Sequence, residues 1–248
     1  MIEARALQKS FGAHRVLDGV TFRIERGESV VIIGRSGGGK SILLKHVIGL
    51  LAPNAGEMLI DGENIAGMNE RQLLRVRRKF GMLFQSAALF DSLTVAENVA
   101  FLLWRERKLS ATEIARRVDE TLEMVDLPGT QSKKPAELSG GMRKRVGLAR
   151  AIVYRPEIVL YDEPTTGLDP VVADSIDQLI LRVCERLDVT SVVVTHDMRS
   201  ARRVGNRILM LHQGRIHVSG TPDEIFASND PVVHRFVTGV SDPKELLF

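Results

Sequence analysis

Residues 34–41 are Gly34-Arg35-Ser36-Gly37-Gly38-Gly39-Lys40-Ser41, a glycine-rich loop that ends in a lysine and a serine. An apolar, β-branched run at 29–33 precedes the loop, and a second apolar run at 42–48 follows it. The first run predicts a buried parallel strand, and the second predicts a helix packed on that strand. A strand, a glycine loop and a helix in this order form a cradle for phosphate groups.

The chemistry of phosphate binding explains this choice of residues. Glycines allow backbone N–H groups to turn inward around phosphate oxygens without a side-chain clash. The first turn of the following helix adds the positive end of its dipole. Lys40 is then expected to reach the β- and γ-phosphates, and the Ser41 hydroxyl to be a ligand of Mg²⁺. The predicted nucleotide contacts are residues 34–41 and the next residue, Ile42.

Composition and charge narrow the class of protein. The chain has 248 residues, of which 44% are apolar and 26% charged, enough for one large domain or two small ones. The net charge of +3 is mildly basic and does not by itself indicate a nucleic-acid partner. Cys184 is the only cysteine, which excludes an internal disulfide and a thiolate zinc cluster and fits a reducing compartment. No run approaches 18 apolar residues and the first residues lack a signal-peptide core, so we expect a cytoplasmic protein. If it works at a membrane, another protein must carry it there.

The order of the patterns predicts an α/β fold. Residues 2–25 alternate between apolar and polar side chains, which is typical of half-buried antiparallel strands. Capping-box pairs begin predicted helices after Thr94 and Ser110, and no strand pattern occurs over 86–138. From 139 onward helices and short strands alternate, as in a parallel sheet covered by helices. We therefore expect a mixed sheet with an inserted helical subdomain.

Two carboxylates close the apolar run at 157–161. Asp162 and Glu163 would lie at the carboxyl edge of a parallel sheet, where ligands bind. Asp162 is expected to hold Mg²⁺, through water, and Glu163 to act as the general base for an attacking water. A solvated strand end gives the same letters, but the phosphate loop in the same chain favours the catalytic interpretation.

Ser139-Gly140-Gly141 begins a basic helix and resembles a second anion site. Ser139 is a good N-cap, and the two glycines expose the first N–H groups of the helix. A simple capped helix would explain the same residues, but it would not explain two anion sites in a chain with one phosphate loop. The basic residues of this helix are Arg143, Lys144, Arg145 and Arg150.

His196 follows the β-branched run at 192–194. A lone histidine at a strand end is more often a structural hydrogen-bonding residue than a catalytic one. His196, however, is expected at the same sheet edge as Asp162, which favours a contact with the γ-phosphate.

Taken in order, these motifs resemble the ATP-binding cassette (ABC) family over essentially the whole chain. The residues that carry the resemblance are Gly34–Ser41, Gln85, Leu138–Gly141, Ile158–Glu163, Gly167-Leu168-Asp169 and His196. The resemblance implies a P-loop NTPase-type mixed sheet with helices on both faces, an N-terminal antiparallel β subdomain and an inserted helical signature subdomain at about 86–153. One ABC ATPase domain would span 1–239, and 240–248 would form a C-terminal tail.

The same resemblance implies a role for each matching residue on the nucleotide. Phe11 matches the aromatic residue that stacks on adenine, with Val16 beside it. Gln85 matches the glutamine that contacts Mg²⁺ and senses the membrane partner. His196 matches the switch histidine. Phe11 departs from the more frequent tyrosine, but no catalytic group is lost and Glu163 is present, which implies a competent ATPase.

Other matching residues imply that a second copy of the chain completes the site. Ser139, Gly140 and Gly141 match the signature that grips the γ-phosphate of ATP bound to the opposite subunit, and Met142 departs from the commonest glutamine. Asp169 matches the aspartate that communicates across this dimer. Two chains that sandwich two ATP molecules head to tail would account for two anion sites and one phosphate loop.

Finer features are similar to one branch, the ATPases of MCE-linked phospholipid transporters such as the Mla system of Gram-negative envelopes. They are Met142, Tyr161–Gly167, Thr195–Met198 and Asp230–Gly239. The resemblance implies work at the cytoplasmic face of the inner membrane with a permease pair, a periplasmic lipid-binding MCE protein and, in many systems, a small STAS-domain protein. Phospholipid transport between the two membranes, for envelope lipid asymmetry, would be the function.

Two other classes stay open. One is the ATPase of a polar amino-acid importer, which has similar length and motifs. The other is a soluble cassette ATPase that acts on DNA or ribosomes, which usually has two cassettes or a long coiled-coil or zinc insertion. This chain has one cassette and one cysteine, so we expect no nucleic-acid partner.

Two apolar segments are candidates for contacts with other chains. Leu89, Phe90 and Leu93 follow Gln85, and either pack in the helical core or meet the permease's coupling helix, as the resemblance implies. Residues 246–248 (Leu246, Leu247 and Phe248) either fray or dock across the dimer or on a small partner, and their apolar area favours docking.

Overall fold

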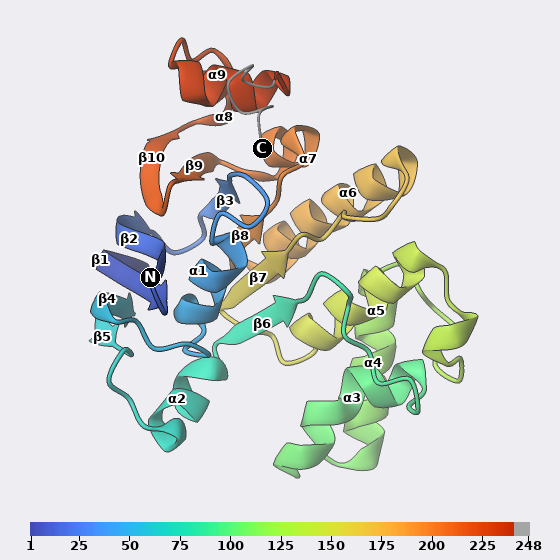
Figure 1. Cartoon of the computed structure of the whole chain (residues 1–248). Coiled ribbons are helices and arrows are strands. Elements are labelled where there is room, and N and C mark those ends of the chain that lie inside the picture. The colour runs from blue at the N-terminus through green and yellow to red at the C-terminus, as the bar shows by residue number, and fades with distance from the viewer. Residues whose placement is uncertain (241–248) are drawn as a thin grey trace. The chain divides into compact units, whose positions relative to one another are not determined.

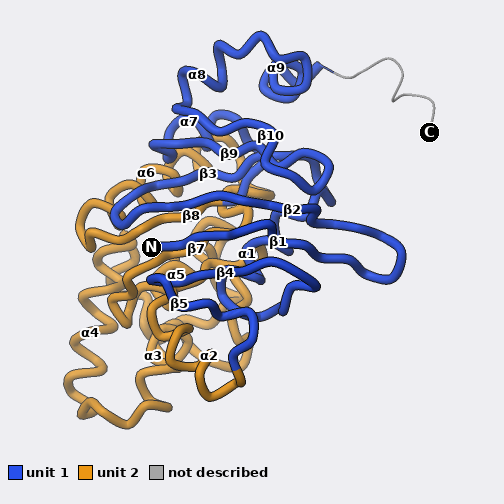
Figure 2. The backbone as a smooth tube through the Cα atoms, turned by 90° about the vertical axis from the view of Figure 1, so that its left-hand side faces the viewer, with its two compact units in different colours: residues 1–68, 194–248 blue, residues 69–193 orange. Residues whose placement is uncertain are grey.

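The structure is a computed structural model that describes residues 1–240. The chain falls into two compact units, one formed by residues 1–68 with the chain from 194 onward and the other by residues 69–193 (Figure 2). The α/β fold class predicted from the sequence is confirmed, with an antiparallel sheet and a mixed sheet accompanied by helices. The predicted docking of Leu246, Leu247 and Phe248 lies outside the described residues, and the predicted domain limits, 1–239 with a helical subdomain at 86–153, stay predictions.

The first unit contains an antiparallel sheet in the order β2-β1-β4-β5 (Figure 1). The alternation seen in the sequence is real, because Ile2, Ala4 and Leu7 are buried along one face of β1. Ile2 pairs with Ile24 on one side and with Ile60 on the other. The strands are β1 (Ile2–Phe11), β2 (His14–Ile24), β4 (Ala55–Ile60) and β5 (Glu63–Asn64).

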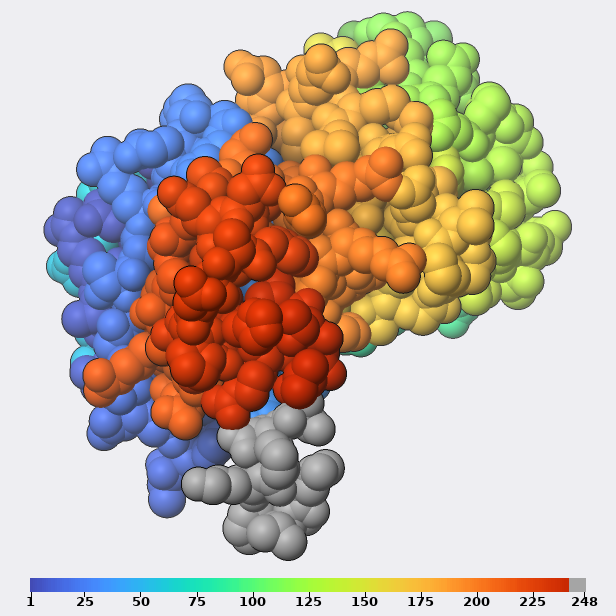
Figure 3. All heavy atoms as spheres, turned by 90° about the horizontal axis from the view of Figure 1, so that it is seen from above, coloured from blue at the N-terminus to red at the C-terminus, as the bar shows by residue number. Residues whose placement is uncertain are grey.

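A mixed sheet in the same unit supports the phosphate loop. β3 pairs in parallel with β9, which pairs in antiparallel fashion with β10. All five residues of β3 are buried, as its continuous apolar sequence predicts. Helices α8 and α9, red in Figure 3, contribute to the outer surface of this unit, and α9 was missed in the sequence. The elements are β3 (Ser29–Ile33), β9 (Arg207–His212), β10 (Arg215–Gly220), α1 (Lys40–Val47), α7 (Met198–Val204), α8 (Pro222–Phe226) and α9 (Pro231–Thr238).

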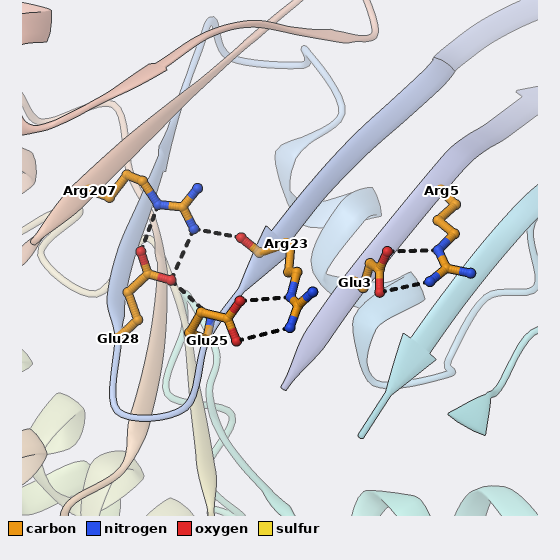
Figure 4. A network of polar contacts seen from close by, with 6 residues as sticks. All are labelled: Glu3, Arg5, Arg23, Glu25, Glu28 and Arg207. Atoms are coloured by element: carbon orange, nitrogen blue, oxygen red, sulfur yellow. Dashed lines mark hydrogen bonds and ion pairs between the residues drawn. The ribbon is translucent and has the colours of Figure 1, made fainter. Parts of the chain in front are cut away.

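An ion-pair network joins the end of β2 to the start of β9 (Figure 4). The Arg207 guanidinium donates from Nε to Glu28 Oε1 at 2.6 Å and from Nη2 to Glu28 Oε2 at 2.9 Å. Arg207 Nη2 also donates to the backbone oxygen of Arg23 at 2.5 Å, and the Glu25 N–H donates to Glu28 Oε2 at 2.9 Å. This bidentate pair therefore connects segments that are 179 residues apart in the sequence.

In the second unit, strands β6 and β7 are parallel and β8 lies next to β7. Helix α5 contacts β6, α3, α4 and α6, which makes it the centre of the unit. Both predicted capping boxes are present, at Thr94 with Glu97 and at Ser110 with Glu113. The elements are β6 (Phe80–Leu83), β7 (Ile158–Asp162), β8 (Thr190–Val194), α2 (Glu70–Arg77), α3 (Val95–Glu106), α4 (Ala111–Met124), the 3₁₀ helix η1 (Pro135–Glu137), α5 (Gly140–Ile152) and α6 (Pro170–Leu187).

Two further facts concern the helices. Within residues 1–240, none of the helices combines the length and apolar character needed to cross a membrane. On α6, burial raises the pKa of the Cys184 thiol.

Candidate functional site

The glycine loop between β3 and α1 can be built only with glycine at two of its positions. Gly34 has φ 154° and Gly39 has φ 95°, both in the region that side chains disfavour. A Cβ on Gly34 would lie 2.3 Å from the backbone oxygen of Leu211, and one on Gly39 would lie 2.9 Å from Val16 Cγ1. The loop therefore packs against β9 and β2, and Val16 of β2 lies against Gly39.

Lys40 has its ammonium inside this loop. The residue is 5% exposed, and Nζ donates to the backbone oxygens of Gly34 at 2.8 Å and Arg35 at 3.0 Å. Ser41 and Ile42 follow in the first turn of α1 and are intermediate in exposure. A cation, a hydroxyl and the N-terminus of a helix thus converge where phosphate groups would bind.

His196 and Phe11 belong to the same unit as the loop. His196 follows β8, is exposed, and lines a hollow of about 600 Å³ together with Gly34, Arg35 and Ser36. Phe11 ends β1, is 48% exposed, and has Lys9 Nζ 5.4 Å from its ring centroid. An exposed aromatic ring of this kind can stack on a nucleobase.

Asp162 and Glu163 lie at the end of β7 in the second unit, as predicted. They are 9% and 8% exposed. Glu163 has φ 51°, a left-handed conformation that is uncommon for a residue with a side chain. The Thr166 hydroxyl donates to Glu163 Oε2 at 3.0 Å, so one carboxylate oxygen has a fixed hydrogen-bond partner.

Ser139 begins α5 and Asp169 begins α6, both as N-caps. Ser139 Oγ accepts from the Met142 N–H at 3.3 Å, and the side chain of Asp169 accepts from the N–H groups of Val171 and Val172 at 3.0 and 3.1 Å. The capping by Asp169 is a structural role that the sequence analysis did not predict. Of the glycines after Ser139, Gly141 is buried, and a Cβ there would lie 2.6 Å from Val172 Cγ1.

Gln85 is the second residue of the loop after β6 and is exposed. Its backbone oxygen accepts a hydrogen bond from Lys144 Nζ, which also donates to the backbone oxygen of Glu163 at 3.1 Å. Lys144 was noted in the sequence only as one of the basic residues of a helix. The burial of Lys144 is what distinguishes it from the other basic residues of α5. This burial depends on how α5 packs against its neighbours, which a single sequence does not reveal.

The loop that follows Gln85 is fixed by a second residue that was missed. Asn98 is fully buried; its Oδ1 accepts from the Phe90 N–H at 2.8 Å, and its Nδ2 donates to three backbone oxygens, those of Phe90, Leu93 and Thr94. Phe90 is 44% exposed, with its ring 4.7 Å from that of Phe101. The alternative that Leu89, Phe90 and Leu93 all pack in the helical core is therefore wrong, because the Phe90 side chain is exposed.

The metal site predicted at Ser41, Gln85 and Asp162 has the right donor chemistry. A hydroxyl, an amide oxygen and a carboxylate are hard oxygen ligands of the kind that Mg²⁺ prefers. Among residues 1–240 no group of three or more His, Cys, Asp or Glu side chains could hold a metal ion. In nucleotide sites Mg²⁺ is bound by one or two carboxylates together with substrate phosphates, so a set of three oxygen donors with one carboxylate is sufficient.

Comparisons with known proteins agree on the family, whereas the names of the relatives give different substrates. Residues 17–166 match the family model described as ABC transporter. The chain is 43% identical to the chloroplastic protein TRIGALACTOSYLDIACYLGLYCEROL 3 of Arabidopsis thaliana, over 98% of this chain and 74% of that protein. It is 38% identical to the intermembrane phospholipid transport system ATP-binding protein MlaF of Haemophilus influenzae, over 98% and 92% of the two chains. Among solved structures, the chain resembles the dimeric, post-hydrolysis structure of the ATP-binding cassette MJ0796 bound to ADP and Pi. The sequence identity is 35% and the TM-score is 0.82, over 90% of this chain and 99% of that chain.

Proposed function

The chain belongs to the ABC transporter family as an ATPase subunit that binds ATP, and we propose that it powers phospholipid transport between the inner and outer membranes, in support of envelope lipid asymmetry. One observation carries this proposal, the identity of 38% over 92% of a relative named for intermembrane phospholipid transport. The Arabidopsis relative, whose name is that of a glycolipid, agrees with a lipid substrate.

The first unit supplies the nucleotide-binding groups in this proposal. Phe11, with Val16 beside it, stacks on adenine, because its ring is exposed at the end of β1. The loop of Gly34–Ser41, with Ile42, surrounds the phosphates, and Lys40 moves its hydrogen bonds from loop oxygens to phosphate oxygens. Mg²⁺, held by Ser41, Asp162 and Gln85, would neutralise charge that develops on the phosphates.

The second unit supplies the base. Glu163 takes the proton of the attacking water, and its buried carboxylate is held by Thr166. His196 of the first unit, at the hollow beside Gly34, contacts the γ-phosphate. Each of these groups acts on the nucleotide or on the water and leaves lipid recognition to partner proteins.

A second copy of the chain completes each site. Ser139, Gly140 and Gly141 begin α5 and offer N–H groups to the γ-phosphate bound by the partner copy, with Asp169 communicating across the interface. The relative that is dimeric and bound to ADP and Pi supports a dimer, and a head-to-tail dimer would share each site between the two copies.

The membrane partner follows from the family. We place the chain at the cytoplasmic face of the inner membrane, on a permease, in a complex with an MCE-type periplasmic protein. A STAS-domain protein is a further candidate for this complex, as the resemblance implies for many such systems. The exposed Phe90 ring, on a loop held by Asn98, offers a defined contact for the permease.

The test combines chemistry and transport in one strain. A strain without the native chain receives the wild type, Glu163→Gln or the control Glu185→Gln, an exposed residue of α6. Glu163→Gln should keep ATP binding and lose about 10²–10⁴-fold of hydrolysis, and phospholipid should accumulate in the outer leaflet of the outer membrane. The control should restore both activities. Normal lipid distribution in the null strain, with reduced amino-acid uptake, would favour the importer instead.

A further inference from the structure

Helix α5 carries two basic side chains inside the second unit that no motif accounts for. Lys144 is 6% exposed and Arg150 is intermediate in exposure. Burial lowers the pKa of both groups, and the carboxylates of Asp162 and Glu163 oppose this for Lys144. A cation kept in such a place requires several hydrogen-bond acceptors.

Lys144 finds its acceptors on two distant segments. Nζ donates to the backbone oxygen of Gln85, 59 residues away, and to that of Glu163, 19 residues away, at 3.1 Å. One ammonium therefore bridges the loop after β6 and the residue proposed as the general base. Neither contact involves the side chain of Gln85 or of Glu163.

Arg150, nearly two turns further along α5, holds the same loop at a different point. Its Nη1 donates to the backbone oxygen of Ala88 and its Nη2 to that of Ala87, both at 2.7 Å. Both alanines have positive φ, 60° at Ala87 and 47° at Ala88. Between the two cations Gly147 lets the helix approach closely, since a Cβ there would lie 3.1 Å from that of Ala87.

Glu163 also has a left-handed backbone, with φ 51°. Such conformations persist only where the surroundings fix them. The backbone oxygen of Glu163 accepts from the Thr166 N–H at 3.3 Å as well as from Lys144. Lys144 is thus placed to fix the peptide plane from which the Glu163 side chain departs.

From this geometry we propose that Lys144 is a positioning residue, which ties the backbone at Gln85 to the backbone at Glu163 and so holds the general base in its catalytic position. The inference rests on the proposed role of Glu163. It implies that a displacement of the loop at Gln85 displaces the base, whereas nucleotide binding by the phosphate loop does not depend on the bridge.

The experiment uses the full chain and measures kcat and KM for MgATP. Lys144→Met keeps the volume and removes the donors, and it should lower kcat by about 10–100-fold, because small misplacements of a catalytic group cost rates of this order. KM should change less than about threefold. Lys144→Gln, whose amide donates two hydrogen bonds, should recover a large part of the lost kcat.

Arg150→Met is the matched control, because it removes equivalent donors on the same helix without touching Glu163. If Lys144 served the fold alone, both Met variants would lose activity in proportion to their loss of thermal stability. We expect a kcat loss from Lys144→Met that exceeds, at equal stability, the loss from Arg150→Met.

Three results would overturn the inference. They are a normal kcat for Lys144→Met, equal losses for the Met and Gln variants of Lys144, and equal losses for the two Met variants at equal stability. If Lys144→Met does not fold, Lys144→Ala against Arg150→Ala makes the same comparison, because alanine also removes the donors of both side chains. Glu163→Gln is assayed in parallel: if it hydrolyses ATP normally the base assignment fails, whereas a dead Glu163→Gln with a normal Lys144→Met rejects the bridge alone.

Discussion

Two buried lysines, Lys40 in the phosphate loop and Lys144 in α5, make the same kind of contact over very different distances along the chain. Each donates to two backbone oxygens. The acceptors of Lys40 are six and five residues away, in its own loop. Those of Lys144 are 59 and 19 residues away, on separate segments.

The difference teaches what each lysine can do. Lys40 can exchange its two carbonyl partners for phosphate oxygens while the loop keeps its shape, because the glycines of the loop tolerate its backbone angles. Lys144 has no such freedom, because its acceptors lie on two separate segments and one of them, Glu163, has a left-handed backbone. A short-range contact is suited to ligand exchange, and a long-range contact is suited to holding a site together.

The largest effects are expected from two substitutions made in separate chains, one in the phosphate loop and one at the start of α5. Lys40→Ala should weaken ATP binding by about 10–10³-fold, because a phosphate charge loses a charge-assisted hydrogen bond. Ser139→Arg, at the start of α5, should abolish hydrolysis while the chain still binds ATP. Nucleotide titration and ATPase assays measure these outcomes.

Mixing the two variants sharpens the test. A heterodimer of Lys40→Ala and Ser139→Arg chains contains one site with both halves intact, so it should recover part of the wild-type ATPase activity. Each variant alone serves as the control. An inactive mixture in which heterodimers are demonstrated would argue against the shared site.

A middle-sized effect is expected at Asn98, whose contacts span only four to eight residues. Asn98→Ala removes four hydrogen bonds to backbone groups of the segment that carries Phe90. Water can afterwards bind some of these backbone groups, which reduces the loss of stability. We expect the free energy of unfolding to fall by about 2–3 kcal/mol in urea denaturation. The exposed Glu120→Ala, near the same helices, should change it by less than about 0.5 kcal/mol. A similarly small change for Asn98→Ala would show that the loop does not depend on this side chain.

The smallest effect tests whether a long-range ion pair, between Arg207 and Glu28, also stabilises the first unit. Burial of Glu28 opposes ionisation, but hydrogen bonds and charge from Arg207 and the Glu25 N–H outweigh it and leave the pKa of Glu28 lowered. A lowered folded-state pKa gives stability that is present above the ordinary glutamate pKa and is lost as the pH falls through the folded value. Against Arg207→Met, the wild type should be more stable by about 0.5–1 kcal/mol at pH 7, since the pair is partly solvated.

This advantage should shrink as the pH falls towards 3. Urea denaturation of both proteins at several pH values measures it. A difference between them that stays constant with pH would mean that Glu28 is not the group responsible.

Much of the fold was predictable because its signals are local. Capping boxes at Thr94 and Ser110 and alternation along 2–25 each involve neighbours within four residues, and the structure has the helices and strands that they predict. The helix α9 was missed, although Asp230 caps it and Pro231 occupies its first turn.

The candidate site divides in the same way. Lys40, Glu163 and Ser139 belong to motifs whose spacing is short and fixed, so the sequence alone was enough to single them out. Lys144 and Arg150 look like ordinary basic residues of a helix, and their burial depends on where α5 packs. A sequence without its relatives holds no record of which loop that helix will meet.

The state of Cys184 makes this chain convenient for site-specific labelling. It is the only thiol in the sequence, and burial on α6 raises its pKa. Thiol-directed dyes react with the thiolate, so Cys184 will be slow at neutral pH. A cysteine placed at an exposed position such as Phe90 would react first, and a fluorophore there could report when a membrane protein docks on the loop, without removal of the native thiol.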